Sequence, residues 1–123
     1  YTSPETKQLT FSQYYPASTA ADDIVAYVVD DPNTLFIAQC DGQVAATAVG
    51  ANIPLANVQS TSTGNTTTGN SNVALDASAT GTTNTIAFRI VGFTDDALNS
   101  VNDSFTQVIV KFNKHFYTQA TGV

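Results

Sequence analysis

The sequence predicts an all-β fold, a small antiparallel β-sandwich or barrel with an extended N-terminal arm. Roughly seven or eight short segments rich in β-branched and aromatic residues follow one another, and turn residues separate them about every ten positions. Only 11% of the 123 residues are charged, less than half of the ~25% that is typical of globular domains. Ser, Thr, Asn and Gly therefore supply most of the surface polarity.

Two apolar runs in the first half of the chain predict a β-hairpin. The runs Ile24–Val29 and Thr34–Gln39 flank the turn residues Asp30–Asn33. Proline fixes φ, and Asp and Asn favour turns, so the chain is expected to reverse there. A second turn at Asp41-Gly42 is expected to close the far end of the hairpin.

Both faces of this predicted hairpin are apolar, whereas a hairpin with one solvated face alternates apolar and polar residues. In its second strand, Leu35 and Ile37 share one face, and Phe36 and Ala38 share the other. If the first pair fills the core, the second pair belongs to an exposed apolar patch. The hairpin is therefore expected in a sandwich interior, under a neighbouring arm or in a subunit interface.

Further segments with strand patterns follow. They are Gln43–Ala48, Ala51–Val58, Val73–Asp76, Thr85–Phe93 and Phe105–Asn113. Pro54 makes the second of them an edge strand or an irregular crossing. In Thr85–Phe93 one face is expected to carry Ile86, Phe88 and Ile90, and the other Ala87, Arg89, Val91 and Phe93. In Phe105–Asn113 the inward residues are expected to be Thr106, Val108, Val110 and Phe112. One helical turn is expected over Ala97–Ser100.

The predicted domain organisation is an N-terminal arm, residues 1–21, followed by a single β domain, residues 22–123. The arm shows no helical period, and Lys7–Ser12 within it predicts a short strand. Its aromatic residues suit packing either on its own domain or on a neighbouring subunit.

A polar tract, Gln59–Asn72, holds fourteen consecutive Gln, Ser, Thr, Gly and Asn residues. No apolar side chain in it offsets the entropy lost on ordering. We expect a long exposed loop or the tip of a β-ribbon. The alternative is an adhesive polar loop that becomes ordered against a partner or a glycan.

The charge balance argues against nucleic-acid partners. The formal net charge is −6, and the four basic residues are scattered along the chain. Nucleic-acid binding needs a basic patch that neutralises phosphates, so neither nucleic acid nor an anionic membrane is expected as a partner. No apolar run approaches the ~18 residues of a membrane span.

No residue pattern predicts a catalytic, cofactor-binding or metal site, and we expect that the chain is not an enzyme. Cys40 and His115 are the only residues of their types, which argues against a transition-metal site. We expect Cys40 to be a buried, unreactive thiol and His115 to be packed or hydrogen-bonded. The acidic pairs at positions 22–23, 30–31 and 95–96 are expected to form turns rather than to bind calcium.

From Tyr27 to Val123 the order of sequence blocks resembles the head cement, or decoration, proteins of tailed bacteriophages. The blocks are VVDDPNTLFIAQCDGQVAATAVGANI, a Thr/Gly tract followed by VALDAS, then IAFRIVGF and finally FTQVIVKFNKHFY. These motifs are structural rather than chemical. The segment Tyr1–Pro16 lies outside the resemblance.

The resemblance implies a structural virion protein on the capsid exterior. Such a protein binds the major capsid protein, usually as a homotrimer, and stabilises contacts between neighbouring capsid subunits. From the residues, we expect the interaction surface to be aromatic. The candidates are Phe11, Tyr14, Tyr15, Tyr27 and Phe36. The alternative function is a carbohydrate-binding or fibre-tip β domain for host attachment, which would place exposed aromatic rings beside polar loops.

Overall fold

The computed structural model describes residues 1–56 and 64–118. The chain divides into two compact units, which are described separately. The arm unit comprises Tyr1–Val29 and Thr63–Asn72, and the sheet unit comprises Asp30–Ser62 and Val73–Val123. The arm predicted to end at residue 21 thus belongs to a unit that extends through Val29. No helix in the described residues has the length and apolar character that crossing a membrane requires.

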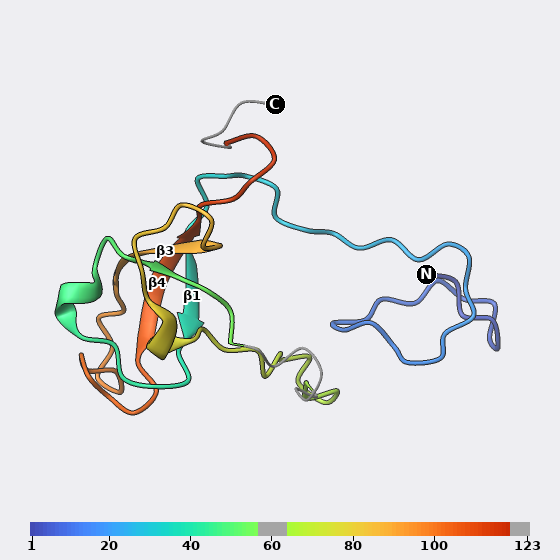
Figure 1. The fold of residues 1–123 in the computed structure, drawn as a ribbon. Helices are drawn as coiled ribbons and strands as arrows, with labels where there is room; N and C mark the ends of the chain where they lie inside the picture. Colours follow the sequence, from blue (N-terminus) through green and yellow to red (C-terminus); the bar gives the residue numbers. More distant parts are fainter. Residues whose placement is uncertain (57–63, 119–123) are drawn as a thin grey trace. The chain divides into compact units, whose positions relative to one another are not determined.

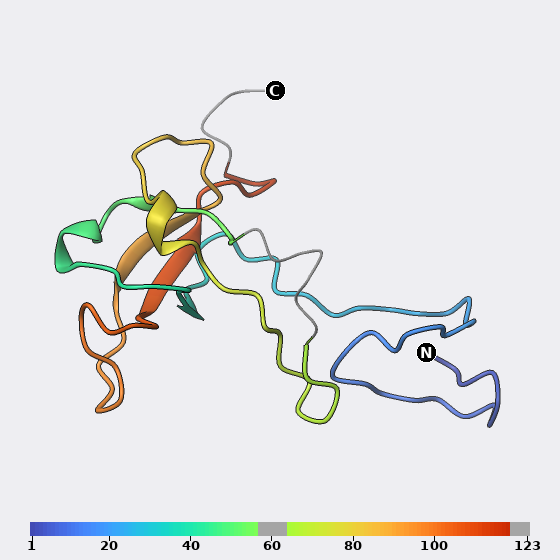
Figure 2. The same cartoon turned by 60° about the horizontal axis from the view of Figure 1, so that its bottom comes forward.

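The sheet unit contains one four-stranded antiparallel sheet with the strand order β1-β4-β3-β2 (Figure 1). The strands are β1 Phe36–Gln39, β2 Asn52–Ile53, β3 Phe88–Phe93 and β4 Gln107–Phe112. Two short 3₁₀ helices, η1 Ala46–Ala48 and η2 Ala77–Ala79, lie beside the sheet in Figure 2. The predicted all-β class is confirmed, with four strands among the described residues instead of seven or eight. Closure into a sandwich or barrel stays a prediction.

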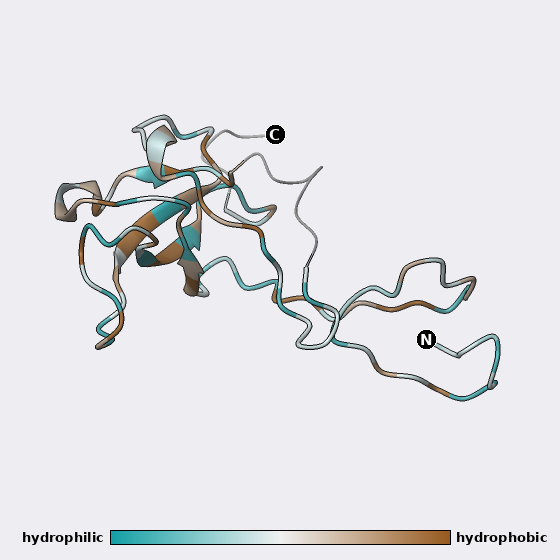
Figure 3. Ribbon diagram, turned by 90° about the horizontal axis from the view of Figure 1, so that it is seen from below, coloured by the Kyte–Doolittle hydropathy of each residue, from teal (hydrophilic) through white to brown (hydrophobic). Residues whose placement is uncertain are grey.

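β4 lies between β1 and β3 in the sheet, and its residues alternate between the two faces. Val108 and Val110 are buried, as predicted, and Phe112 contacts Phe36 and Phe88 with ring centroids 5.5 and 4.7 Å apart. The fully buried members of the core cluster are Cys40, Val44, Ile53, Leu75, Ile90, Val108 and Val110. The strands change between brown and teal along their length in Figure 3, which reflects this alternation.

The buried Thr106 closes the core at one end of β4. Its hydroxyl donates to the carbonyl of Asp103 (2.9 Å) and accepts the N–H of Val44 (3.2 Å). A buried polar group with both capacities satisfied avoids the desolvation penalty of an unpaired one. The side chain therefore fixes two loops against the strand.

A β-bulge in β3 changes the predicted orientation of one aromatic residue. Ile90 pairs with Val110, but the next paired position is Gly92 with Ile109, so Val91 is the extra residue. An extra residue in one strand reverses the alternation beyond it. Phe93 consequently packs against the core, on the side of Phe88 and Ile90. Its predicted placement on the face of Arg89 was wrong.

The predicted hairpin is not formed. Ile24–Val29 contains no strand, whereas part of the second run becomes β1, which pairs with β4 through Phe36 and Val110. The face assignment within β1 is also reversed. Phe36 and Ala38 pack against the core, and Ile37 is 69% exposed. The faces are reversed because β1 pairs with β4 and not with Ile24–Val29. In the observed register, the buried valines of β4 lie opposite Phe36 and Ala38.

Three local predictions for the sheet unit need correction. Gln43–Ala48 contains η1 instead of a strand, because its run of small residues offers little surface for cross-strand packing. Val73–Asp76 does not form a continuous strand, and Leu75 within it makes isolated bridges to Cys40 and Leu55. The segment Ala97–Ser100 forms a turn, in which the N–H of Asn99 donates to Asp96 O (3.0 Å), instead of a helical turn.

The arm unit begins with a small ribbon that folds back on itself. Thr2 and Leu9 form an antiparallel bridge, and the N–H of Lys7 donates to Ser3 O (2.9 Å). Lys7 closes this turn with a left-handed φ of 58°. The predicted strand Lys7–Ser12 is thus reduced to the single bridge at Leu9.

The described part of the polar tract, residues 64–72, builds its own turn. Asn65 Oδ1 accepts the N–H groups of Thr67 (2.9 Å) and Thr68 (3.2 Å), and the N–H of Gly69 donates to Asn65 O (2.7 Å). Its side chains are mostly exposed, as predicted, although Gly69 is half-buried beside Gln13. Residues 59–63 of the tract lie outside the described residues.

Candidate functional site: the aromatic cavity of the arm

The arm unit contains a cavity of about 480 Å³. Three stretches line it, namely Tyr1, Leu9–Pro16 and Asp23–Tyr27. We call it the arm cavity. Four of the five predicted interaction residues lie along it, which are Phe11, Tyr14, Tyr15 and Tyr27. The fold of the arm thus brings together aromatic side chains from distant positions in the chain.

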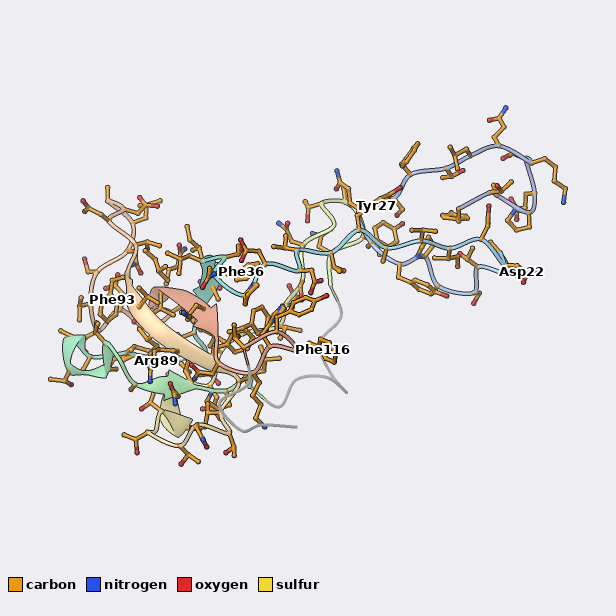
Figure 4. All side chains as sticks on the ribbon, turned by 90° about the horizontal axis from the view of Figure 1, so that it is seen from above. Asp22, Tyr27, Phe36, Arg89, Phe93 and Phe116 are labelled. Carbon is orange, nitrogen blue, oxygen red and sulfur yellow. The ribbon has the colours of Figure 1, made fainter. Side chains whose placement is uncertain are left out.

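These aromatic residues are largely uncovered. Tyr27 is 91% exposed, Phe11 82% and Tyr15 71%. Figure 4 labels Tyr27 on its extended stretch of backbone. Single exposed apolar residues are common on protein surfaces, but a contiguous group around one concavity marks an interaction site.

Hydrogen bonds from the backbone of Thr2 hold Asp23, one of the residues that line the arm cavity, in place. Both carboxylate oxygens of Asp23 accept the backbone N–H of Thr2, each at 2.9 Å. This hydrogen bonding to Thr2 holds the pKa of Asp23 below its ordinary value of 3.8. Since Thr2 also bridges to Leu9, the contact closes the arm into a loop.

Phe36, the fifth predicted interaction residue, is not part of this site. Its ring packs edge-on against Phe112 at an interplanar angle of 83°. It contributes to the core of the sheet unit instead. Its exposed neighbour Ile37 is the apolar residue of β1 that is available for an external contact.

Sequence reasoning missed the aliphatic part of the arm cavity. Leu9, Ile24 and Val25 line it together with the aromatic rings. Their apolar character was visible in the sequence, but Ile24 and Val25 were assigned to a hairpin. The missing signal was the long-range contact between Thr2 and Asp23, which no local periodicity encodes.

Cys40 and His115 behave as packed structural residues. Cys40 is fully buried, and burial together with the neighbouring Asp41 raises the pKa of its thiol to about 11. His115 Nε2 lies 3.3 Å from Asp30 Oδ1, and its Nδ1 accepts the N–H of Tyr117 (3.2 Å).

The acidic pairs supply acceptors for backbone N–H groups. Asp31 accepts the N–H of Asn33 (2.8 Å), and Asp96 accepts that of Leu98 (3.2 Å), so the prediction of turns is confirmed for these two pairs. In the third pair Asp23 instead makes its long-range contact with Thr2. Across residues 1–56 and 64–118, no three His, Cys, Asp or Glu side chains group together as metal ligands.

Comparison with known proteins identifies no relative: no family model, curated protein or solved structure matches the chain.

Proposed function

We propose that this chain is a structural protein of a bacteriophage virion that binds the outer surface of the capsid. It stabilises contacts between subunits of the major capsid protein and acts as a homotrimer. The observation that carries the proposal is the arm cavity, where Phe11, Tyr15 and Tyr27 stand exposed around one concavity. The resemblance of the sequence from Tyr27 to Val123 to cement proteins supplies the identity of the partner and the trimer.

The chemistry of the arm suits a permanent protein partner. Aromatic side chains each bury ~150–250 Å² on association and are the usual anchors of interfaces. A few of them, with Leu9 and Val25, supply a large part of the ~800 Å² per partner that a stable interface needs. Asp23, at the edge of the arm cavity, is the one charged side chain that lines it.

The charge distribution supports a position on the outside of the shell. The chain carries ten acidic and four basic residues. An acidic protein is repelled by packaged DNA, whose phosphates attract basic surfaces. A protein on the outer surface of the capsid does not face the packaged DNA and therefore needs no basic surface.

A second candidate function is carbohydrate binding for host attachment. Tyr14 and Tyr15 line the same cavity as the polar residues Ser12 and Gln13. Aromatic faces beside hydrogen-bonding side chains are also the chemistry that binds sugar rings. In this alternative, the arm cavity binds a sugar ligand instead of anchoring the chain to the capsid.

Immunogold labelling of intact particles tests the proposal. Antibodies raised against the purified chain are applied to virions of the phage that encodes it. We expect gold over the whole head surface in many copies per particle. Labelling confined to tail or fibre tips would overturn the capsid proposal and favour host attachment. Binding of the purified chain to a glycan array would support the same conclusion.

A further inference from the structure

The segment Ile24–Val29 has the properties of a strand without a partner. It is six residues long, without a charge, Gly or Pro, and rich in the β-branched and aromatic residues that strands favour. It runs as an extended light-blue stretch in Figure 1. No hydrogen bond from the described chain reaches its backbone, and Tyr27 and Val28 are 91% and 80% exposed.

The same chain presents an open strand edge at β1. On its inner edge, β1 pairs with β4, and the following N–H of Cys40 donates to Thr106 O (2.9 Å). On its outer edge, Gln39 O accepts the N–H of Leu75 (2.9 Å). Main-chain groups two residues apart point to the same edge, so the N–H and C=O of Ile37 also point outward. Among the described residues they have no partner outside the sheet.

Ile24–Val29 and the outer edge of β1 at Ile37 both need main-chain hydrogen-bond partners. Extended apolar backbone and an uncovered strand edge each need main-chain hydrogen-bond partners once water is excluded. Adding a strand from another molecule to an exposed edge satisfies both at once. The side chains of Ile37 and Leu35, 69% and 53% exposed, would meet those of the incoming segment.

We propose that Ile24–Val29 of one copy adds as a strand to the outer edge of β1, at Ile37, in a second copy of this chain. Each copy carries one donor segment and one acceptor edge, so head-to-tail exchange closes into a ring when the rotation permits. The inference deepens the homotrimer of the proposed function by naming the segments that join its subunits. Strand addition draws the side chain of Tyr27 into the junction between copies, and Phe11, Tyr14 and Tyr15 remain along the arm cavity.

Exposed apolar side chains lie on both elements of the proposed junction. Tyr27 by itself brings on the order of 150–250 Å². Three exposed valines of the donor, Val25, Val28 and Val29, and the exposed Ile37 of the acceptor add to it. Packing of the donor strand on the acceptor edge covers these side chains and contributes to the roughly 1,200–2,000 Å² in total that specific interfaces bury.

Disulfide trapping in the full-length protein tests the inference. Ile37→Cys is combined in separate variants with Val25→Cys, Tyr27→Cys or Val28→Cys, which sample both faces and several registers. Paired cysteines must bring their Cα atoms within ~4.4–6.8 Å to bond. The native Cys40 is buried, and the wild type serves as the control for its reactivity. Non-reducing gels and the sedimentation mass are read on the same samples.

We expect at least one double variant to form cross-linked dimers and trimers, while the wild type forms none. A disulfide within one chain would overturn the inference, because the segment would then pair with its own β1 as a hairpin. A trimer by sedimentation without any cross-link would overturn strand addition and leave the proposed trimer intact. A monomer at micromolar concentration would overturn both.

A proline substitution gives a second, independent readout. Val28→Pro removes a main-chain donor and fixes φ in the proposed strand. We expect the dissociation constant for self-association to rise about tenfold or more. Ala17→Pro, at an exposed arm position outside the segment, is the matched control and should leave it unchanged. Equal dissociation constants for Val28→Pro and the wild type would contradict the proposal.

Discussion

The carboxylate of Asp23 holds the backbone N–H of Thr2 with both oxygens at 2.9 Å, across twenty-one positions of sequence. This one contact closes the arm into a loop and sets the wall of the arm cavity beside Ile24 and Val25. Since an ionised carboxylate accepts such bonds more strongly than a protonated one, the closure depends on pH.

The pH dependence of the arm follows from the lowered pKa of Asp23. The folded pKa lies below the ordinary 3.8 of the unfolded chain. The stabilisation is therefore fully present above pH 3.8 and is lost as the pH falls through the lower folded value. In an NMR titration, the amide shift of Thr2 should move with a midpoint below pH 3.8, and Asp23→Asn should abolish the transition. A midpoint at or above 3.8 would contradict the contact.

Adjacent residues of β1 should respond oppositely to a charge. Phe36 packs on Phe112 in the core, so Phe36→Asp would bury an unpaired carboxylate and should prevent folding. The milder Phe36→Ala should lower the free energy of unfolding by about 3 kcal/mol. Ile37→Asp, at an exposed position, should change it by less than about 0.5 kcal/mol.

Urea denaturation of these variants distinguishes the two faces of β1. Ile37→Asp should remain folded and lose self-association, because Ile37 lies at the proposed acceptor edge. A folded Phe36→Asp together with an unfolded Ile37→Asp would show that the observed register of β1 on β4 is wrong.

Two of the four basic residues stand opposite each other in the sheet. Arg89 in β3 pairs with Lys111 in β4. Among the described residues, the one contact within 4.0 Å between a basic and an acidic side chain joins His115 and Asp30, so no acid compensates the pair Arg89 and Lys111. Like charges opposite each other in a sheet are destabilising. Lys111→Thr should therefore raise the free energy of unfolding by about 0.5 kcal/mol at low salt.

Chemical denaturation at low and high ionic strength checks this prediction. The gain should shrink at high salt, because salt screens the repulsion. Lys114→Thr, an exposed position outside the strand, is the control and should show no comparable gain. A loss of stability in Lys111→Thr at low salt would mean that the pair is neutralised or separated.

Substitution of Gly69 tests the turn that residues 64–72 form. This residue has φ +74°, and a Cβ built there would lie 2.6 Å from the Cβ of Gln13. Gly69→Ala should destabilise the turn by about 1 kcal/mol, which corresponds to about fivefold faster amide exchange at Thr67 and Gly69. Adding Gln13→Gly should recover part of the protection by removing the close contact. Unchanged exchange in Gly69→Ala would show that the turn does not pack on Gln13.

The sheet was predictable where one strand carried a clear alternation. The pattern of Phe105–Asn113 predicted the inward residues of β4 because the polar Gln107 and the charged Lys111 flank Val108 and Val110. The pattern of Thr85–Phe93 predicted β3 but not the orientation of Phe93, because the apolar pattern does not reveal the bulge at Val91.

The hairpin prediction failed for a different physical reason. Strand propensity mostly reflects packing against neighbours, and it does not say which neighbour. Thr34–Gln39 found its partner in β4, far along the chain, and Ile24–Val29 was left unpaired. Apolar character on both faces of that segment indicated an additional contact, but local sequence cannot distinguish a core from a subunit interface.

The candidate site was predictable in its residue types and not in its geometry. Phe11, Tyr14, Tyr15 and Tyr27 were identified because exposed aromatic residues anchor interfaces. Their convergence on one cavity depends on the contact between Asp23 and Thr2, which joins two segments without regular structure. Phe36 was assigned to the surface because its face was inferred from the wrong strand pairing.

Binding to capsids tests the central claim most directly. Heads from a phage lacking the gene for this chain are mixed with purified wild type, Phe11→Asp or Leu98→Asp, and cosedimentation is measured. Phe11 lines the arm cavity, whereas Leu98, 90% exposed, lies outside it and is the matched control. We expect the wild type and Leu98→Asp to saturate the heads, and Phe11→Asp to bind at least about tenfold more weakly. Failure of the wild type to cosediment would contradict the proposed function, and equal binding of Phe11→Asp would contradict the role of the arm cavity.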